Sequence, residues 1–311
     1  MLLKKNIPIS YVFGKIKLEL SLLTAYSTIV YVAHTYFNFP GVSIPIAIPG
    51  ILGTIISLLL AFRSNQAYDR WWEARTLWGA IVNDSRTFAR QVLTFVDNSY
   101  DDQDKRDMKE RMIKRQMAWC YSLSQHLRGQ DAHQSLKNYI SEEERKAIST
   151  MEHVPLALLE QHGNDLRLLH RMGWINDFQQ VTMDETLTRF SNSKGGCERI
   201  KNTVFPVTYS VYIHFLVLLF VLLLPFSLIE VFGVIQIPMV VAISSSFFLI
   251  EKMAIHLQDP FECKPTDTPT TSISRKIEDN LRQLLKDEYP QEQQIPTTAA
   301  PAKKDTMFYI L

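Results

Sequence analysis

Two long stretches of the chain contain neither lysine nor arginine. They run from residue 18 to 62 and from residue 202 to 251, although the 311 residues include 33 of these basic side chains. A helix needs about 20 residues to cross the hydrocarbon core of a bilayer, so each stretch can hold two membrane spans and a short turn. We predict spans at about residues 18–37, 46–63, 207–229 and 236–254.

The mean hydropathy of −0.05 would suggest a soluble protein, but it averages over segregated apolar and charged segments. Two buried helical hairpins of a soluble protein are therefore the alternative. The first span, which contains Glu19 and His34, is a weak membrane helix taken alone. The segment 207–229, "VTYSVYIHFLVLLFVLLLPFSLI", favours the membrane because so apolar a helix is difficult to bury elsewhere.

The basic residues also predict the orientation of the spans. Both expected outer turns lack Lys and Arg, whereas the N-terminal segment and residues 63–204 are rich in them. Loops that carry Lys and Arg stay in the cytoplasm, so both termini and the large middle segment should be cytoplasmic. The N-terminus shows no signal-peptide pattern.

The segment between the second and third spans has the pattern of helices throughout. Ser141 with Glu144, and Thr182 with Glu185, match the capping box that begins a helix. Pro155 fits the first turn of another helix. The pair Gly195–Gly196 indicates a break between helices. A further amphipathic helix is expected at 273–286, and 291–311 has the composition of a flexible tail. The fold class is therefore all-α.

The composition and motifs argue against several classes of function. A net charge of +1 gives no basic face for nucleic acid. No phosphate-binding, dinucleotide-binding or hydrolase motif is present, so we expect no enzyme, no catalytic residues and no cofactor. Cys120, Cys197 and Cys263 are scattered, and the eight His residues show no ligand spacing, so no metal site is expected.

The second span carries the most specific signal. Thr54, Leu58 and Phe62 recur at every fourth position and lie on one stripe of a helix. If copies of this helix surround an axis, the stripe forms stacked apolar rings that exclude water until they widen. The alternative is a stripe that faces lipid or packs against a neighbour, and spacing alone favours this alternative. The helix should continue past Phe62 to about residue 96.

Four segments resemble the signatures of the bestrophin family in its bacterial branch. They occur in the expected order, and the resemblance covers about residues 10 to 290. The segments are "FRSNQAYDRWWEARTLWG" (62–79), "SKGGCERIKNTVFPVTYS" (193–210), "LLPFSLI" (223–229) and "LQDPFE" (257–262).

This resemblance implies a homopentamer around one ion pathway, in a bacterial inner membrane and in contact with its lipids. Residues 1–290 would form a single channel domain, with residues 64–204 and 255–290 in the cytosol. Thr54, Leu58 and Phe62 would line the neck, with Thr54 in place of the usual aliphatic residue. Phe178 would form a second, cytosolic aperture.

The resemblance also bears on regulation and selectivity. Animal relatives bind calcium through an acidic run after the "DPF" motif, whereas here Lys264 and Pro265 interrupt Asp259, Glu262 and Asp267. Calcium prefers six to eight oxygen ligands, so calcium gating is not expected. Similarity to the bacterial branch favours monovalent cations such as Na⁺, with an anion (chloride) channel of the same architecture as the alternative. A secondary transporter and a non-conducting membrane scaffold are weaker alternatives.

Overall fold

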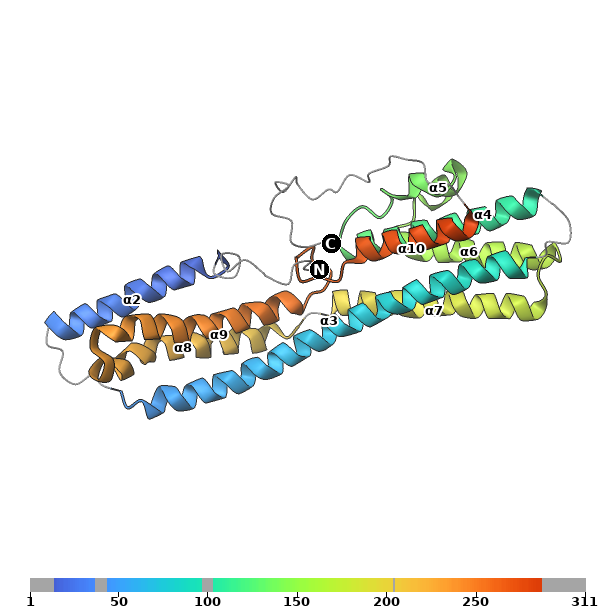
Figure 1. The fold of residues 1–311 in the computed structure, drawn as a ribbon. Helices are drawn as coiled ribbons and strands as arrows, with labels where there is room; N and C mark the ends of the chain where they lie inside the picture. The colour runs from blue at the N-terminus through green and yellow to red at the C-terminus, as the bar shows by residue number, and fades with distance from the viewer. Residues whose placement is uncertain (1–13, 37–43, 97–102, 204, 287–311) are drawn as a thin grey trace. The chain divides into compact units, whose positions relative to one another are not determined.

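A computed structural model describes residues 14–36, 44–96, 103–203 and 205–286. Within these ranges the chain forms α-helices and short 3-10 turns, with no strand, which confirms the all-α prediction (Figure 1). The tail predicted for residues 291–311 lies outside the described residues.

The described residues form two compact units. The apolar unit comprises residues 14–36, 44–71 and 205–259, and the polar unit comprises residues 72–96, 103–203 and 260–286. Helix α3, Ala47–Phe95, belongs to both units and has no break in its 49 residues. The predicted continuation of the second span to about residue 96 is therefore confirmed.

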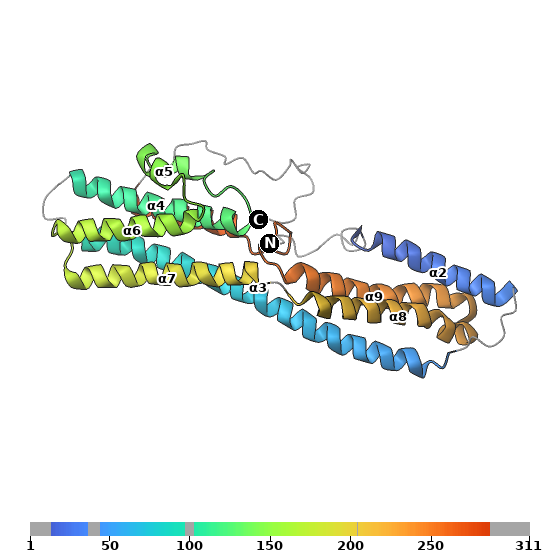
Figure 2. The same ribbon diagram turned by 180° about the vertical axis from the view of Figure 1, so that it is seen from behind.

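The apolar unit contains α2 (Lys17–Tyr36), the first half of α3, α8 (Val207–Phe232) and α9 (Gln236–Leu257). Helices α8 and α9 lie side by side, and α2 runs along α9 (Figures 1 and 2). The chain reverses between α8 and α9 at Gly233, whose φ of 51° suits a residue without a Cβ. These boundaries follow the four apolar segments seen in the sequence.

Two segments of the described chain are long and apolar enough to cross a membrane. They are α3 and the stretch Val207–Leu257, which contains both α8 and α9. Helix α2 does not reach this criterion, in keeping with its polar residues. Many large apolar side chains in this unit nevertheless remain exposed, including Leu22 on α2 and Phe215 on α8. Such surfaces require lipid or other protein copies to cover them.

The polar unit is a helical bundle built around α4. It contains α4 (Gln103–Leu127), α5 (Glu142–Ile148), α6 (Val154–Arg171), α7 (Asp177–Asn202) and α10 (Thr270–Leu285). Helix α4 packs against α6, α7 and α10. Figure 2 shows α6 and α7 side by side. Aromatic contacts among Phe88, Trp119 and Phe190 form part of its core.

Local signals placed two of the three predicted helix starts correctly. The Ser141 hydroxyl accepts a hydrogen bond from the Glu144 N–H, and Pro155 lies in the first turn of α6. The predicted cap at Thr182 is wrong, because the Asn176–Gln179 capping box already begins α7. Thr182 lies inside the helix, where its hydroxyl donates to the Phe178 carbonyl.

The glycine pair Gly195–Gly196 does not separate two helices as predicted, because both residues lie inside α7. A Cβ on Gly196 would come within 2.8 Å of the Leu77 Cδ1 atom. The pair therefore has a packing role: the missing side chain allows α7 to approach the second half of α3 closely.

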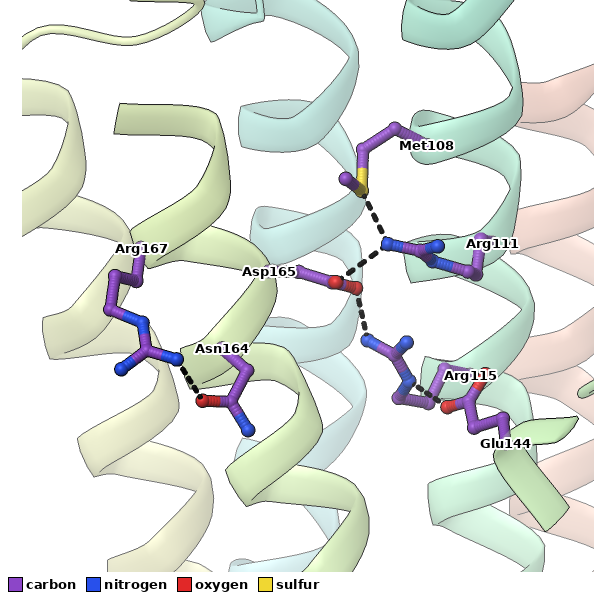
Figure 3. A network of polar contacts seen from close by, with 7 residues as sticks. All are labelled: Met108, Arg111, Arg115, Glu144, Asn164, Asp165 and Arg167. Atoms are coloured by element: carbon purple, nitrogen blue, oxygen red, sulfur yellow. Dashed lines mark hydrogen bonds and ion pairs between the residues drawn. The ribbon is translucent and has the colours of Figure 1, made fainter. Parts of the chain in front are cut away.

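Buried charges connect α4, α5 and α6 (Figure 3). The Arg115 side chain is 2% exposed; its Nη1 donates to Asp165 Oδ2 at 2.5 Å, and its Nε donates to Glu144. Arg111 donates to the other Asp165 oxygen at 2.6 Å. Because each buried charge has opposite-charge partners, the network avoids the large cost of an isolated buried ion.

His162 of α6 lies fully buried near this network, and neither of its ring nitrogens has a hydrogen-bond partner among the described residues. Burial, followed by the positive charge of Arg115, holds the pKa of His162 well below its usual value of 6.5. The folded protein therefore keeps His162 neutral at a pH where an unfolded chain would protonate it.

This depressed pKa predicts a pH-dependent stability. The stability contributed by neutral His162 is present above pH 6.5 and is lost as the pH falls below that value, by up to about 1.4 kcal/mol per pH unit. Thermal unfolding of the purified protein, measured between pH 7.5 and 5.5, should show a Tm that falls as the pH is lowered. His162→Phe should flatten this dependence, and an unchanged pH profile in the variant would contradict the assignment.

Candidate functional site

The three residues predicted to line a neck share one exposed stripe of α3. Leu58 is 59% exposed and Phe62 is 54% exposed, and Thr54 is also exposed. The Thr54 hydroxyl donates to the Gly50 carbonyl at 2.9 Å, so its hydrogen is used within the helix. The exposed surface of the stripe therefore consists of the methyl groups of Thr54 and Leu58 and the ring of Phe62, and it carries no charged group.

The opposite face of α3 is buried in the apolar unit. Ile56, Leu60 and Arg63 are each at most 2% exposed. At Gly53 the helix passes close to α8, because an added Cβ would lie 3.2 Å from the Phe220 ring. This packing fixes the rotation of α3, and successive helical residues turn by about 100°. The stripe from Thr54 to Phe62 must therefore point away from the subunit's own core.

A buried ion pair, joined by a half-exposed histidine, holds α3 in this rotation directly after the stripe. Arg63 Nη1 lies 3.9 Å from Glu251 Oε1 of α9, and the guanidinium lies 5.6 Å from the centre of the Phe205 ring. His214 Nδ1 of α8 lies 3.2 Å from both Glu251 oxygens. The three helices are thus connected where the Lys/Arg-free stretches end.

The stripe becomes polar beyond Phe62. Asn65 and Gln66 are exposed one turn further along α3, and Asp69 is exposed two turns further. Arg70, the next residue, is directed away from the stripe and toward the end of α9. Its Nε donates to the Gln258 carbonyl at 2.9 Å, and its Nη2 lies 3.8 Å from Asp259. The exposed charge on this part of the stripe is therefore acidic.

The residue predicted for the cytosolic aperture lies in the polar unit. Phe178 is the second residue of α7 and is 86% exposed, so its ring does not pack into the core of its own subunit. The Asn176–Gln179 capping box fixes the start of this helix. Beside it, Asp177 Oδ1 lies 2.6 Å from His170 Nε2. An exposed ring held at a rigid helix start is available to contact other copies.

The cluster of Arg63, Glu251 and His214 was not predicted from the sequence. A signal existed, because Arg63 ends the first Lys/Arg-free stretch and Glu251 lies at the end of the second. Charges at equivalent ends of two predicted spans are expected to lie at a similar depth, where they can pair. Nothing in the spacing, however, indicates that His214 joins them.

Comparison with known proteins finds one family and relatives of that family over most of the chain. A model of the bacterial and fungal bestrophin proteins matches residues 6–283. The chain is 33% identical over 247 residues to a voltage-dependent anion channel-forming protein of Nostoc sp., covering 78% of this chain and 79% of the relative. It is 30% identical over 293 residues to the voltage-dependent anion channel-forming protein YneE of Salmonella typhi, covering 94% and 92%.

Solved structures show the same similarity. The crystal structure of a bacterial bestrophin homologue from Klebsiella pneumoniae superimposes with a TM-score of 0.82 at 28% identity. The match covers 88% of this chain and 100% of that chain.

The charge cluster below the stripe predicts an effect on stability. Glu251→Gln removes the countercharge of buried Arg63, a change that costs about 3 kcal/mol and should lower the Tm by about 5–10 °C. Thermal unfolding of the purified protein in detergent measures this shift. The matched control, Glu230→Gln, changes an exposed residue near the end of α8 and should leave the Tm unchanged. Equal Tm values for the two variants would contradict a stabilising role for Glu251.

Proposed function

The chain belongs to the bacterial and fungal bestrophin family, whose members are ion channels and not enzymes, and we propose that five copies of it surround one central pathway for small monovalent ions. Rings of identical subunits are the usual way in which short bundles enclose a pore. The apolar unit of a single copy leaves many large apolar side chains exposed, which supports burial against neighbours and lipid.

We assign α2, the first half of α3, α8 and α9 to four membrane spans of an inner membrane. Helix α2 enters this assignment through its packing along α9 and the absence of Lys and Arg after its first residue, Lys17. Both termini and the polar unit are cytoplasmic by the distribution of Lys and Arg.

The proposed neck consists of five copies of Thr54, Leu58 and Phe62. The observation that carries this assignment is that the stripe is exposed while the opposite face of the same helix is fully buried. In a ring, apolar side chains at this position repel water and close the pathway until the ring widens. The five copies of Thr54 form a wider opening than those of Leu58 and Phe62, because threonine is smaller and more polar. Phe178 forms the second constriction, in the cytosol.

The charges along α3 favour cations. Asp69 follows the neck on the same stripe, whereas Arg63 and Arg70 are directed toward Glu251 and Asp259. A ring of carboxylates at the pathway raises the local concentration of cations and repels anions. We therefore propose a preference for monovalent cations such as Na⁺.

The second candidate is an anion channel of the same architecture. The observation that favours it is that the relatives from Nostoc sp. and Salmonella typhi are named as anion channel-forming proteins. The two candidates differ only in the sign of the permeant ion, so a single electrical measurement separates them.

We also propose that calcium does not gate the channel. Glu262 accepts a hydrogen bond from Lys201 at 2.8 Å, and Asp267 Oδ2 accepts one from the Lys264 backbone N–H at 3.0 Å. These two oxygens already have partners, and Lys264 adds a positive charge between them in the sequence. Asp267 Oδ1 is buried without a hydrogen-bond partner among the described residues, but it is a single carboxylate oxygen. Such a set does not offer the several free oxygens that calcium takes.

The constrictions predict that smaller side chains increase conductance. Phe62→Ala and Phe178→Ala should each raise the single-channel current about tenfold, because each removes a ring that excludes water. Recordings in planar bilayers measure the current. The matched control for the neck is Phe215→Ala, which truncates an exposed phenylalanine of α8 in the same unit. Leu156→Ala on α6 serves the same purpose for Phe178.

The controls should conduct as the unchanged protein does. If neither Phe62→Ala nor Phe178→Ala alters the current, the pathway does not run along these residues. If the controls increase it as well, the effect is a general loosening of the subunit and the assignment fails.

The charge on the stripe predicts the selectivity. With a salt gradient across the bilayer, the reversal potential should have the sign of a cation-selective pore, and Asp69→Asn should lower the ratio of cation to anion permeability about tenfold. Asp107→Asn, an exposed carboxylate of α4, is the control and should change nothing. The opposite sign in the unchanged protein would establish the anion channel. A silent bilayer from assembled particles, with Phe178→Ala silent as well, would indicate a scaffold.

A further inference from the structure

The polar unit brings together three side chains that can bind a metal ion. His126 is the penultimate residue of α4, His153 directly precedes the start of α6, and Glu198 lies near the end of α7. One ligand atom from each of the three lies within 4.8 Å of the other two. The residues are far apart in the sequence, so no motif or spacing indicated this group.

The distances suit a small ion with short bonds. His153 Nε2 lies 3.0 Å from Glu198 Oε1, and His126 Nε2 lies 3.9 Å from the same oxygen. The two imidazole rings are close, with centroids 4.5 Å apart. Zinc bonds to nitrogen and oxygen measure about 2.0–2.2 Å, so two ligands of a tetrahedral site are separated by about 3.3 Å. Small side-chain rotations bring the three atoms to this spacing.

The donor types select among metals. Two imidazole nitrogens and one carboxylate suit zinc and similar transition metals, whereas calcium and magnesium prefer all-oxygen sites. Three protein ligands leave one position of a tetrahedron for water or another small ligand. The His126 and His153 side chains are 32% and 37% exposed, so ions can reach the site from solution.

Two further contacts support a built site. Lys194, one turn before Glu198 on α7, places its Nζ 3.0 Å from Glu198 Oε2 and 3.2 Å from Oε1, so it holds the carboxylate beside the imidazoles. A metal ion at Oε1 would replace the longer of these two hydrogen bonds, and Oε2 would keep the shorter one. His153 makes no capping hydrogen bond with its side chain, and its Nδ1 is buried without a partner among the described residues. The ring is therefore not engaged in capping α6, and its Nε2 contacts Glu198 instead.

We propose that His126, His153 and Glu198 bind a zinc ion that connects the ends of α4, α6 and α7 in the polar unit. This inference does not depend on the identity of the permeant ion or on the neck assignment. Because the metal binds the folded bundle and not the unfolded chain, occupancy should stabilise the polar unit.

The test measures zinc binding by the full-length purified protein. After treatment with a chelator and its removal, titration calorimetry should show one Zn²⁺ bound per chain, and Zn²⁺ should raise the Tm. His153→Ala and Glu198→Gln should each weaken binding at least about tenfold and abolish the Tm increase. The control is His133→Ala, which removes a histidine outside the group and should bind as the unchanged protein does.

Co²⁺ provides an independent measurement on the unchanged protein. Tetrahedral coordination gives intense visible absorption bands, which should appear with one equivalent of Co²⁺ and disappear when Zn²⁺ is added. Absence of stoichiometric binding, or octahedral Co²⁺ absorption alone, would overturn the proposal even if a variant failed to fold. Unchanged binding in His153→Ala and Glu198→Gln would overturn it as well, and would reduce the group to a hydrogen-bonded cluster.

Discussion

The unbroken hydrogen-bonded backbone of α3 is the constraint on which the proposed pathway depends. Within one helix, each residue's direction is set by its neighbours, because successive residues turn by about 100°. Burial of Ile56, Leu60 and Arg63 in the apolar unit therefore decides where Leu58 and Phe62 point. A kink or break would uncouple these directions, and the helix contains neither between Ala47 and Phe95.

Charge pairing and close packing maintain these directions in each unit. In the apolar unit, Glu251 holds Arg63 inward, so the residue directly after Phe62 does not add a positive charge to the stripe. In the polar unit, Gly196 lets α7 approach the second half of α3 near Leu77. Each subunit buries some side chains in its own core and leaves others exposed. The exposed side chains would decide whether the surface of the proposed pathway is polar or apolar.

Burial also determines which ionisable groups are available to respond to the environment. His162 is enclosed and stays neutral, whereas His126 and His153 remain partly exposed beside Glu198. The same residue type therefore has a structural role in one place and can act as a ligand in another. The difference lies in access to water and in the nearest charge, which is Arg115 for His162 and a carboxylate for the pair.

The sequence by itself determined the all-α fold, the positions of the apolar helices and the common stripe of Thr54, Leu58 and Phe62, because helical periodicity and the absence of Lys and Arg are local properties. The exposure of that stripe was decided by the burial of the opposite face of α3. It misjudged Thr182 and Gly196, whose roles depend on an earlier cap and on a neighbouring helix. Only the tertiary structure paired Arg63 with Glu251 and brought His153 to Glu198. Such contacts join residues distant in the chain, and their geometry arises from the packing of helices, which no local pattern encodes.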